Sequence, residues 1–168
     1  MRLLLSLAFI LAAVDAPDKA WWVTEQVAPT DTEYLGHSVD TLRSEFEKVA
    51  IFTCGSDGVF SSSQCQELAE QGAMFRVEMS PGNASEALRW EVGLAETEAG
   101  QDYKILIASS LKDDEIEAVF SEYTVDTHFS ALFVRDGSLF WTHCLECGQF
   151  AEVLYEAGRW ILDWGDEY

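Results

Sequence analysis

Apolar and polar residues alternate in several stretches of the chain, which is the pattern of a strand with one buried face. Asp136-Gly137 separates two of these stretches and is the strongest short hairpin signal in the sequence. The predicted strands cover residues 49–54, 73–79, 88–94, 103–109, 129–135, 138–143 and 160–164. Residues 84–95 also fit a helix, which is the main alternative for that part of the chain.

In other stretches the apolar residues recur every three or four positions, as on one face of a helix. Ser63 followed by Gln66 resembles a capping box, and Gly72 offers a left-handed stop for the short helix that would follow. The predicted helices cover residues 39–49, 63–72, 110–123 and 148–157. Strands and helices do not alternate regularly, so the sequence predicts an α+β fold. We expect a single domain over residues 17–168, with three or four helices and a mainly antiparallel sheet of roughly five to seven strands.

The first residues of the chain have the layout of a secretory signal peptide. Arg2 gives a positive start, an apolar run of about 12 residues extends from Leu3 to Val14, and small residues follow. This run is too short to span a bilayer core of about 30 Å as a helix. The sequence therefore predicts a signal peptide over residues 1–16. The mature protein is expected to be secreted or otherwise extracytoplasmic, without insertion into a membrane.

Composition adds a strong acidic charge. The chain has 10 Lys and Arg against 30 Asp and Glu, which gives a formal net charge of −20. Such a field repels nucleic-acid phosphates and anionic membrane surfaces. It attracts cationic partners and raises their association rate, although an acidic surface also serves solubility. The expected partner is therefore a basic protein rather than a nucleic acid or a membrane.

Aromatic residues gather near the carboxyl end, where Trp160, Trp164 and Tyr168 are mixed with acidic residues. Aromatic rings anchor interfaces and carboxylates steer a basic partner, so these three residues are candidate partner-binding residues. The alternative is a final strand packed on the sheet.

Asn83 begins an Asn-Ala-Ser sequon in a predicted turn and is a candidate glycosylation site.

Four cysteines, Cys54, Cys65, Cys144 and Cys147, are expected to form disulfides in an oxidising compartment. Four cysteines allow three pairings. The favoured pairing is local, Cys54 with Cys65 and Cys144 with Cys147. A crossed pairing would close longer loops and stabilise the fold more, and the sequence leaves both arrangements open.

The Cys144 and Cys147 pair follows a predicted strand and precedes a predicted helix. Over about 20 residues this arrangement is similar to the strand–CxxC–helix entry of the thioredoxin family. The resemblance implies a thiol–disulfide oxidoreductase that uses these two cysteines, because a helix N-terminus lowers the pKa of a thiol.

Cys65 with Glu67, together with the later CxxC, is also similar to the C-x-E and C-x-x-C pair of cytidine deaminases, which implies a zinc site. His143 beside Cys144 would make the CxxC half of a zinc site. The other half is missing, because Cys54, Cys65, His37 and His128 show no ligand spacing, so no metal or other cofactor is predicted. No specific catalytic motif is present. The sequence therefore favours an exported acidic binding module that engages or inhibits a cationic protein. The thiol–disulfide oxidoreductase is the alternative.

Overall fold

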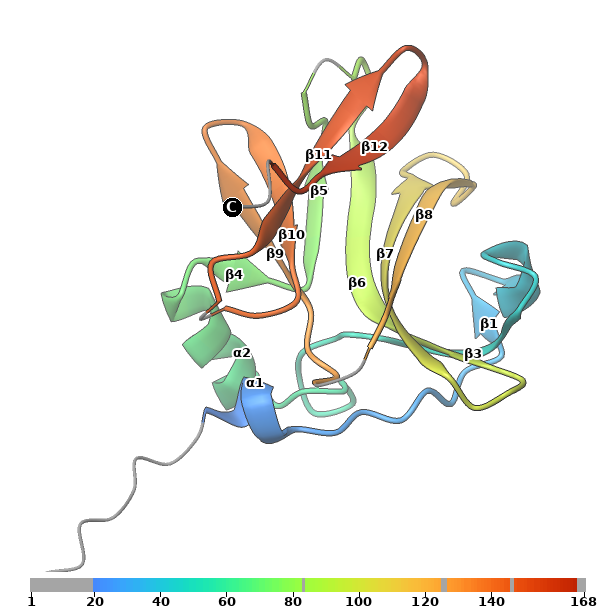
Figure 1. Cartoon of the computed structure of the whole chain (residues 1–168), viewed down its shortest axis with the longest axis vertical. Coiled ribbons are helices and arrows are strands. Elements are labelled where there is room, and N and C mark those ends of the chain that lie inside the picture. The colour runs from blue at the N-terminus through green and yellow to red at the C-terminus, as the bar shows by residue number, and fades with distance from the viewer. Residues whose placement is uncertain (1–19, 83, 125–126, 146, 166–168) are drawn as a thin grey trace, which may run out of the picture.

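Two five-stranded β-sheets form most of the protein (Figure 1). The computed structural model describes residues 20–82, 84–124, 127–145 and 147–165. The predicted signal peptide and two candidate residues, Asn83 and Tyr168, lie outside the described residues.

The first sheet is built around β6 (Leu88–Thr97), which pairs on one side with β7 (Asp102–Ser110). β8 (Ile116–Tyr123) extends the sheet beyond β7. On its other side β6 pairs with two strands. β3 (Phe46–Ile51) lies beside its second half and β5 (Arg76–Met79) beside its first half. Every pair is antiparallel.

The second sheet is also antiparallel and joins distant parts of the chain. Its order is β12 (Arg159–Asp163), β11 (Phe150–Glu156), β10 (Ser138–Thr142), β9 (Ala131–Arg135) and β4 (Ala73–Met74). Phe75 alone separates β4 from β5, so the chain passes from the second sheet to the first at this residue. Its buried ring lies 4.8 Å from Phe60 and 5.3 Å from Phe52, centroid to centroid, which anchors the crossing in the core.

Short elements surround the two sheets. α1 (Trp21–Thr24) and α2 (Ser62–Glu70) lie at one end of the molecule (Figure 1). A two-stranded hairpin, β1 (Glu33–Tyr34) with β2 (His37–Ser38), runs into a 3-10 turn at Val39–Thr41. This hairpin and turn lie next to β3 and cover the outer face of the first sheet.

The first sheet is buried on both faces, because each face carries its own hydrophobic core. The main core lies between the sheets and includes Trp90 and Leu94 of β6 with Trp141 and Val153 of the second sheet. The outer core lies on the opposite face of the first sheet. It comprises Tyr34, Val39, Leu42, Phe46, Val49, Ala95, Ile105 and Ile107.

The expected α+β class is wrong. The protein is mainly β, with three sheets and, within the described residues, two α-helices. The stretches 39–49, 110–123 and 148–157, predicted as helices, instead contain or overlap strands β3, β8 and β11. In β8, Ile116 and Val119 pack on the outer core, while Ala118 and Phe120 pack on the main core. A strand with apolar contacts on both faces loses its period of two, and its spacing then imitates a helix.

Signals carried by a few neighbouring residues predict the structure better than the spacing of apolar residues does. Asp136 and Gly137 connect β9 to β10 with φ values of 52° and 85°, as a type I′ hairpin turn requires. The short helix predicted from Ser63 is α2, although its capping box uses Ser61 and Gln64. Residues 88–97 form a strand, so the helical alternative for that stretch is wrong.

Candidate functional site

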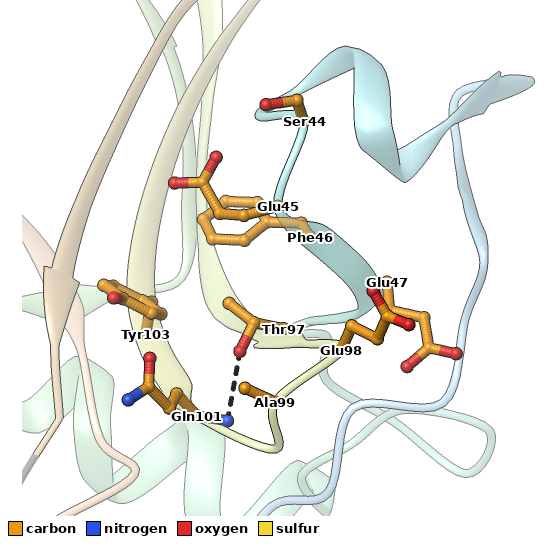
Figure 2. Close-up of a pocket in the computed structure, with 9 residues that line it drawn as sticks. All are labelled: Ser44, Glu45, Phe46, Glu47, Thr97, Glu98, Ala99, Gln101 and Tyr103. Atoms are coloured by element: carbon orange, nitrogen blue, oxygen red, sulfur yellow. Dashed lines mark hydrogen bonds between the residues drawn. The ribbon is translucent and has the colours of Figure 1, made fainter.

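An open pocket of about 830 Å³ lies at the end of the first sheet where β6 turns into β7 (Figure 2). Three parts of the chain line it: residues 44–47 around the start of β3, residues 97–99 with Gln101 at the β6–β7 turn, and Tyr103 of β7. Its volume is within the range of ligand-binding sites, about 300–1,000 Å³. The pocket is therefore a candidate location for recognition of another molecule.

Two backbone features place acidic side chains around this pocket. The register of β3 against β6 shifts between Phe46 and Lys48, so Glu47 lies at a bulge, and bulges redirect side chains. Across the pocket, Gln101 N donates to Thr97 Oγ1 at 3.2 Å, which closes the turn that carries Glu98. Figure 2 shows the carboxylates of Glu47 and Glu98 at the same end of the pocket.

Aromatic rings from three strands form a row that begins in the pocket, where Tyr103 lies on the side away from the carboxylates of Glu47 and Glu98 (Figure 2). Phe46 is buried, and its ring centroid is 5.8 Å from that of Tyr103. Tyr103 in turn lies 5.7 Å from Tyr123 of β8. Tyr123 is 56% exposed, the largest exposure of any large hydrophobic residue in the described ranges. We call Glu45, Phe46, Glu47, Glu98, Tyr103 and Tyr123 the acidic–aromatic surface.

One basic residue of the chain already contacts the acidic–aromatic surface. The guanidinium carbon of Arg43 lies 5.5 Å from the ring centroid of Phe46 and 6.0 Å from that of Tyr103. An Arg43 Nη atom is 2.5 Å from Glu45 Oε1, and the other donates to Ser121 Oγ. Distances within about 6 Å of a ring centroid are those of cation–π interactions. The rings and carboxylate are thus arranged to hold a guanidinium group.

The remaining carboxylates of the surface have no such partner. Within the described part of the chain, neither Glu47 nor Glu98 forms an ion pair, whereas Lys48 is paired with Glu96 at 2.9 Å. Both side chains are exposed. Two exposed carboxylates without a salt bridge, in the pocket that Tyr103 also lines, are suited to a basic side chain from outside.

A second group of titratable side chains lies near the CxxC sequence. His143 Nδ1 is 3.6 Å from Glu122 Oε2, and its ring packs 4.6 Å from Trp141 and 4.9 Å from Trp164. Burial, with a smaller effect of Lys104, lowers the pKa of His143 to about 4. Burial also raises the pKa of Glu122. His143 is therefore neutral at physiological pH, which suits its place between two indole rings.

The disulfides have the predicted local pairing. Cys54 is bonded to Cys65 of α2, and Cys144 is bonded to Cys147. The second pair lies between β10 and β11, and the backbone N–H of Cys147 donates to Cys144 Sγ at 3.1 Å. The predicted helix after Cys147 is strand β11, so the helix N-terminus that would activate a thiol is absent there. Among the described residues no group of three or more His, Cys, Asp or Glu is placed to hold a metal.

The two candidate tryptophans in the described ranges lie away from the acidic–aromatic surface. Trp160 packs 4.9 Å from Trp90 and 4.7 Å from Tyr155, which places it over the opposite half of β6. Trp164 packs against Trp141 and His143. Both indoles are partly buried in contacts with their own fold. They contribute to packing of the β11–β12 hairpin and of the residues after β12.

Sequence reasoning missed the residues of the acidic–aromatic surface. Phe46 and Tyr123 fall within the stretches 39–49 and 110–123, whose apolar spacing predicts helices where the structure has strands β3 and β8. The only local signal was the alternation of acid and aromatic residues at Glu45, Phe46 and Glu47. Their approach to Tyr103 depends on strand register, which the sequence pattern does not provide.

Comparison with protein families, with curated proteins and with solved structures found no match. None of the helices in the described ranges has the length and apolar character needed to cross a bilayer.

Proposed function

We propose that this chain is an exported acidic binding module, and that it engages or inhibits a cationic protein through the acidic–aromatic surface. The observation that carries the proposal is the pair of exposed carboxylates without a salt bridge, Glu47 and Glu98, in the pocket that Tyr103 also lines. The formal net charge of −20 would draw a basic partner toward the molecule before this contact forms.

Each part of the surface has a distinct role in this proposal. Aromatic side chains such as Tyr123 supply contact area with little loss of conformational freedom, so they serve as anchors. Glu47 and Glu98 at the pocket would set the orientation of the partner and raise its association rate. We further propose that the protein is secreted or extracytoplasmic, which its two disulfides support because such bonds persist in oxidising compartments.

The test is binding of the chain from residue 17 onward to a basic protein such as lysozyme, measured by biolayer interferometry. Salt is raised from about 0.01 M to about 0.1 M, over which the screening length falls from about 30 Å to about 10 Å. We expect affinity to fall more than about tenfold over this range, because the attraction is electrostatic.

Two double variants separate the surface from the overall charge. E47Q/E98Q removes two charges at the pocket, and E67Q/E70Q removes two exposed charges on α2, at the far end of the molecule (Figure 1). We expect the first variant to weaken binding about three- to tenfold more than the second, which corresponds to about 0.7–1.4 kcal/mol. Equal losses, or binding without salt dependence, would contradict the proposal.

A further inference from the structure

Arg43 shows how the acidic–aromatic surface accommodates a cation, because it is a guanidinium that the chain itself places there. It contacts the rings of Phe46 and Tyr103 and the carboxylate of Glu45. The side chains of Arg43 and Glu45 are 42% and 41% exposed, respectively. Exposed ion pairs of this kind contribute little to stability, so the pair with Glu45 does not by itself hold Arg43 in this position.

The geometry favours guanidinium over ammonium. A guanidinium is planar, stacks on aromatic faces and presents a fork of donors to carboxylates, whereas a lysine ammonium is a compact and strongly hydrated charge. The surface offers both elements within one contact: two rings within about 6 Å of the guanidinium carbon, and a carboxylate at hydrogen-bond distance. The neighbouring carboxylates of Glu47 and Glu98 remain available to further basic groups.

We propose that an arginine side chain of the basic partner takes the place of Arg43 on the rings of Phe46 and Tyr103. The surface therefore selects arginine-bearing over lysine-bearing partners, and Arg43 is an intramolecular competitor that sets the affinity. This inference rests on the proposed function and specifies the chemistry of its ligand.

The test uses two peptides of equal length and charge, hexa-arginine and hexa-lysine, titrated into the chain from residue 17 onward. We expect the arginine peptide to bind the wild type about three- to tenfold more tightly, because a planar guanidinium stacks on the rings and presents its donor fork to the carboxylate, whereas an ammonium is more strongly hydrated. R43A should strengthen arginine-peptide binding about two- to fivefold by removing the competitor.

The matched control is K112A. Lys112 follows β7 at the opposite end of the β7–β8 hairpin from Tyr103 and Tyr123, and its removal changes the net charge by the same amount. The lysine peptide should respond equally to R43A and K112A, whereas the arginine peptide should respond more to R43A. R43K keeps the charge but loses the planar group, so it should also strengthen arginine-peptide binding. This variant replaces R43A in the test if R43A folds poorly.

The outcomes distinguish this inference from the proposed function. Salt-sensitive binding of both peptides with equal affinity would overturn arginine selection while leaving a basic-protein module intact. Equal responses of the arginine peptide to R43A and K112A would overturn the exchange at Arg43. Absence of binding by either peptide would overturn both proposals.

Discussion

The hydroxyl of Tyr34 donates a 2.6 Å hydrogen bond to Glu91 Oε2, joining two buried residues that are 57 positions apart in the sequence. Tyr34 ends β1, and Glu91 lies in β6, so the bond ties the covering hairpin to the outer face of the first sheet. The outer core beneath it includes Phe46, the buried ring of the acidic–aromatic surface. This contact therefore links the stability of the covering segment to the proposed binding site.

Replacing Tyr34 by Phe should destabilise the protein by about 1–3 kcal/mol, because the buried Glu91 carboxylate loses a donor while the ring is kept. Urea denaturation at neutral pH measures the change. T41A removes only an exposed hydroxyl that bonds Ser38 O at 2.7 Å, and it is the control. A Y34F protein as stable as the wild type would show that the hydrogen bond contributes nothing to the fold.

The same pair predicts a response to alkali. Burial, the hydrogen bond to Glu91 and its charge raise the pKa of Tyr34 above the ordinary tyrosine value. The folded state therefore retains this proton at a pH where the unfolded state has lost it. Stability must then fall as pH rises beyond about 10, the pKa of an unperturbed tyrosine. Chemical denaturation at several alkaline pH values should show a smaller loss for Y34F, and parallel curves would exclude this linkage.

The lowered pKa of His143 predicts how the stability of the protein changes as the pH falls below neutral. Its pKa of about 4 in the fold, against 6.5 ordinarily, means that the unfolded state binds the proton more tightly. Stability should therefore fall by up to about 3 kcal/mol as pH decreases through this window. Glu122 opposes the effect, because its raised pKa makes the folded state take up a proton on acidification.

The variant H143Q isolates the contribution of this residue. Its stability should depend less on pH between 6.5 and 4 than that of the wild type, whatever its absolute stability. T41A, which removes no titratable group, is the control and should keep the wild-type slope. An unchanged slope in H143Q would show that the buried imidazole does not control acid stability.

The part of the fold that could be predicted is the part fixed by neighbouring residues. Asp136-Gly137 adopts the two left-handed conformations of a hairpin turn, which few residues besides Asn, Asp and Gly favour. The α2 helix carries its own cap, and both disulfides close short loops. These features depend little on the rest of the molecule.

The remainder depends on contacts between distant residues. Ala157-Gly158 shows the ambiguity well, because a glycine at this place suits a helix end, yet the structure uses it in the turn between β11 and β12. The pocket is harder still to predict. It requires Phe46 to lie opposite Thr97, with a bulge immediately after Phe46, and no local pattern specifies that register.

The two disulfides should differ in their contribution to stability. Cys54 and Cys65 are 11 residues apart, and Cys144 and Cys147 are 3 apart. The loop-entropy relation gives about 3 kcal/mol for the first and about 2 kcal/mol for the second. Thermal unfolding of C54A/C65A and C144A/C147A compares them. A larger loss in the second variant would show that the CxxC bridge braces more than its own turn.

The reduction potential of the CxxC bridge tests the alternative function. Structural disulfides have potentials below about −300 mV, whereas catalytic ones are more oxidising. Because no helix begins at this bridge, we expect a potential in the structural range. Equilibration of C54A/C65A with glutathione or dithiothreitol buffers measures it. A potential near those of thioredoxin-like oxidoreductases would restore the redox hypothesis.

The close packing of β6 against β3 at Gly93 should affect binding of a basic protein. A Cβ at this position would lie 2.4 Å from the carbonyl oxygen of Ala50 and 3.1 Å from the Cα of Ile51, both backbone atoms of β3. Neither can rotate away, so G93A must displace β3, which carries Phe46 and Glu47. We expect a loss of about 1–3 kcal/mol and weaker binding of a basic protein by the folded variant.

The control for G93A is E117A, an exposed position on β8 of the same sheet. It should leave the thermal midpoint nearly unchanged, whereas G93A should lower it by roughly 2–4 °C for each kcal/mol lost. If G93A is destabilised but binds like the wild type at a temperature where it is fully folded, the position of β3 does not control the surface. If neither property changes, β3 and β6 are farther apart at Gly93 than the structure shows.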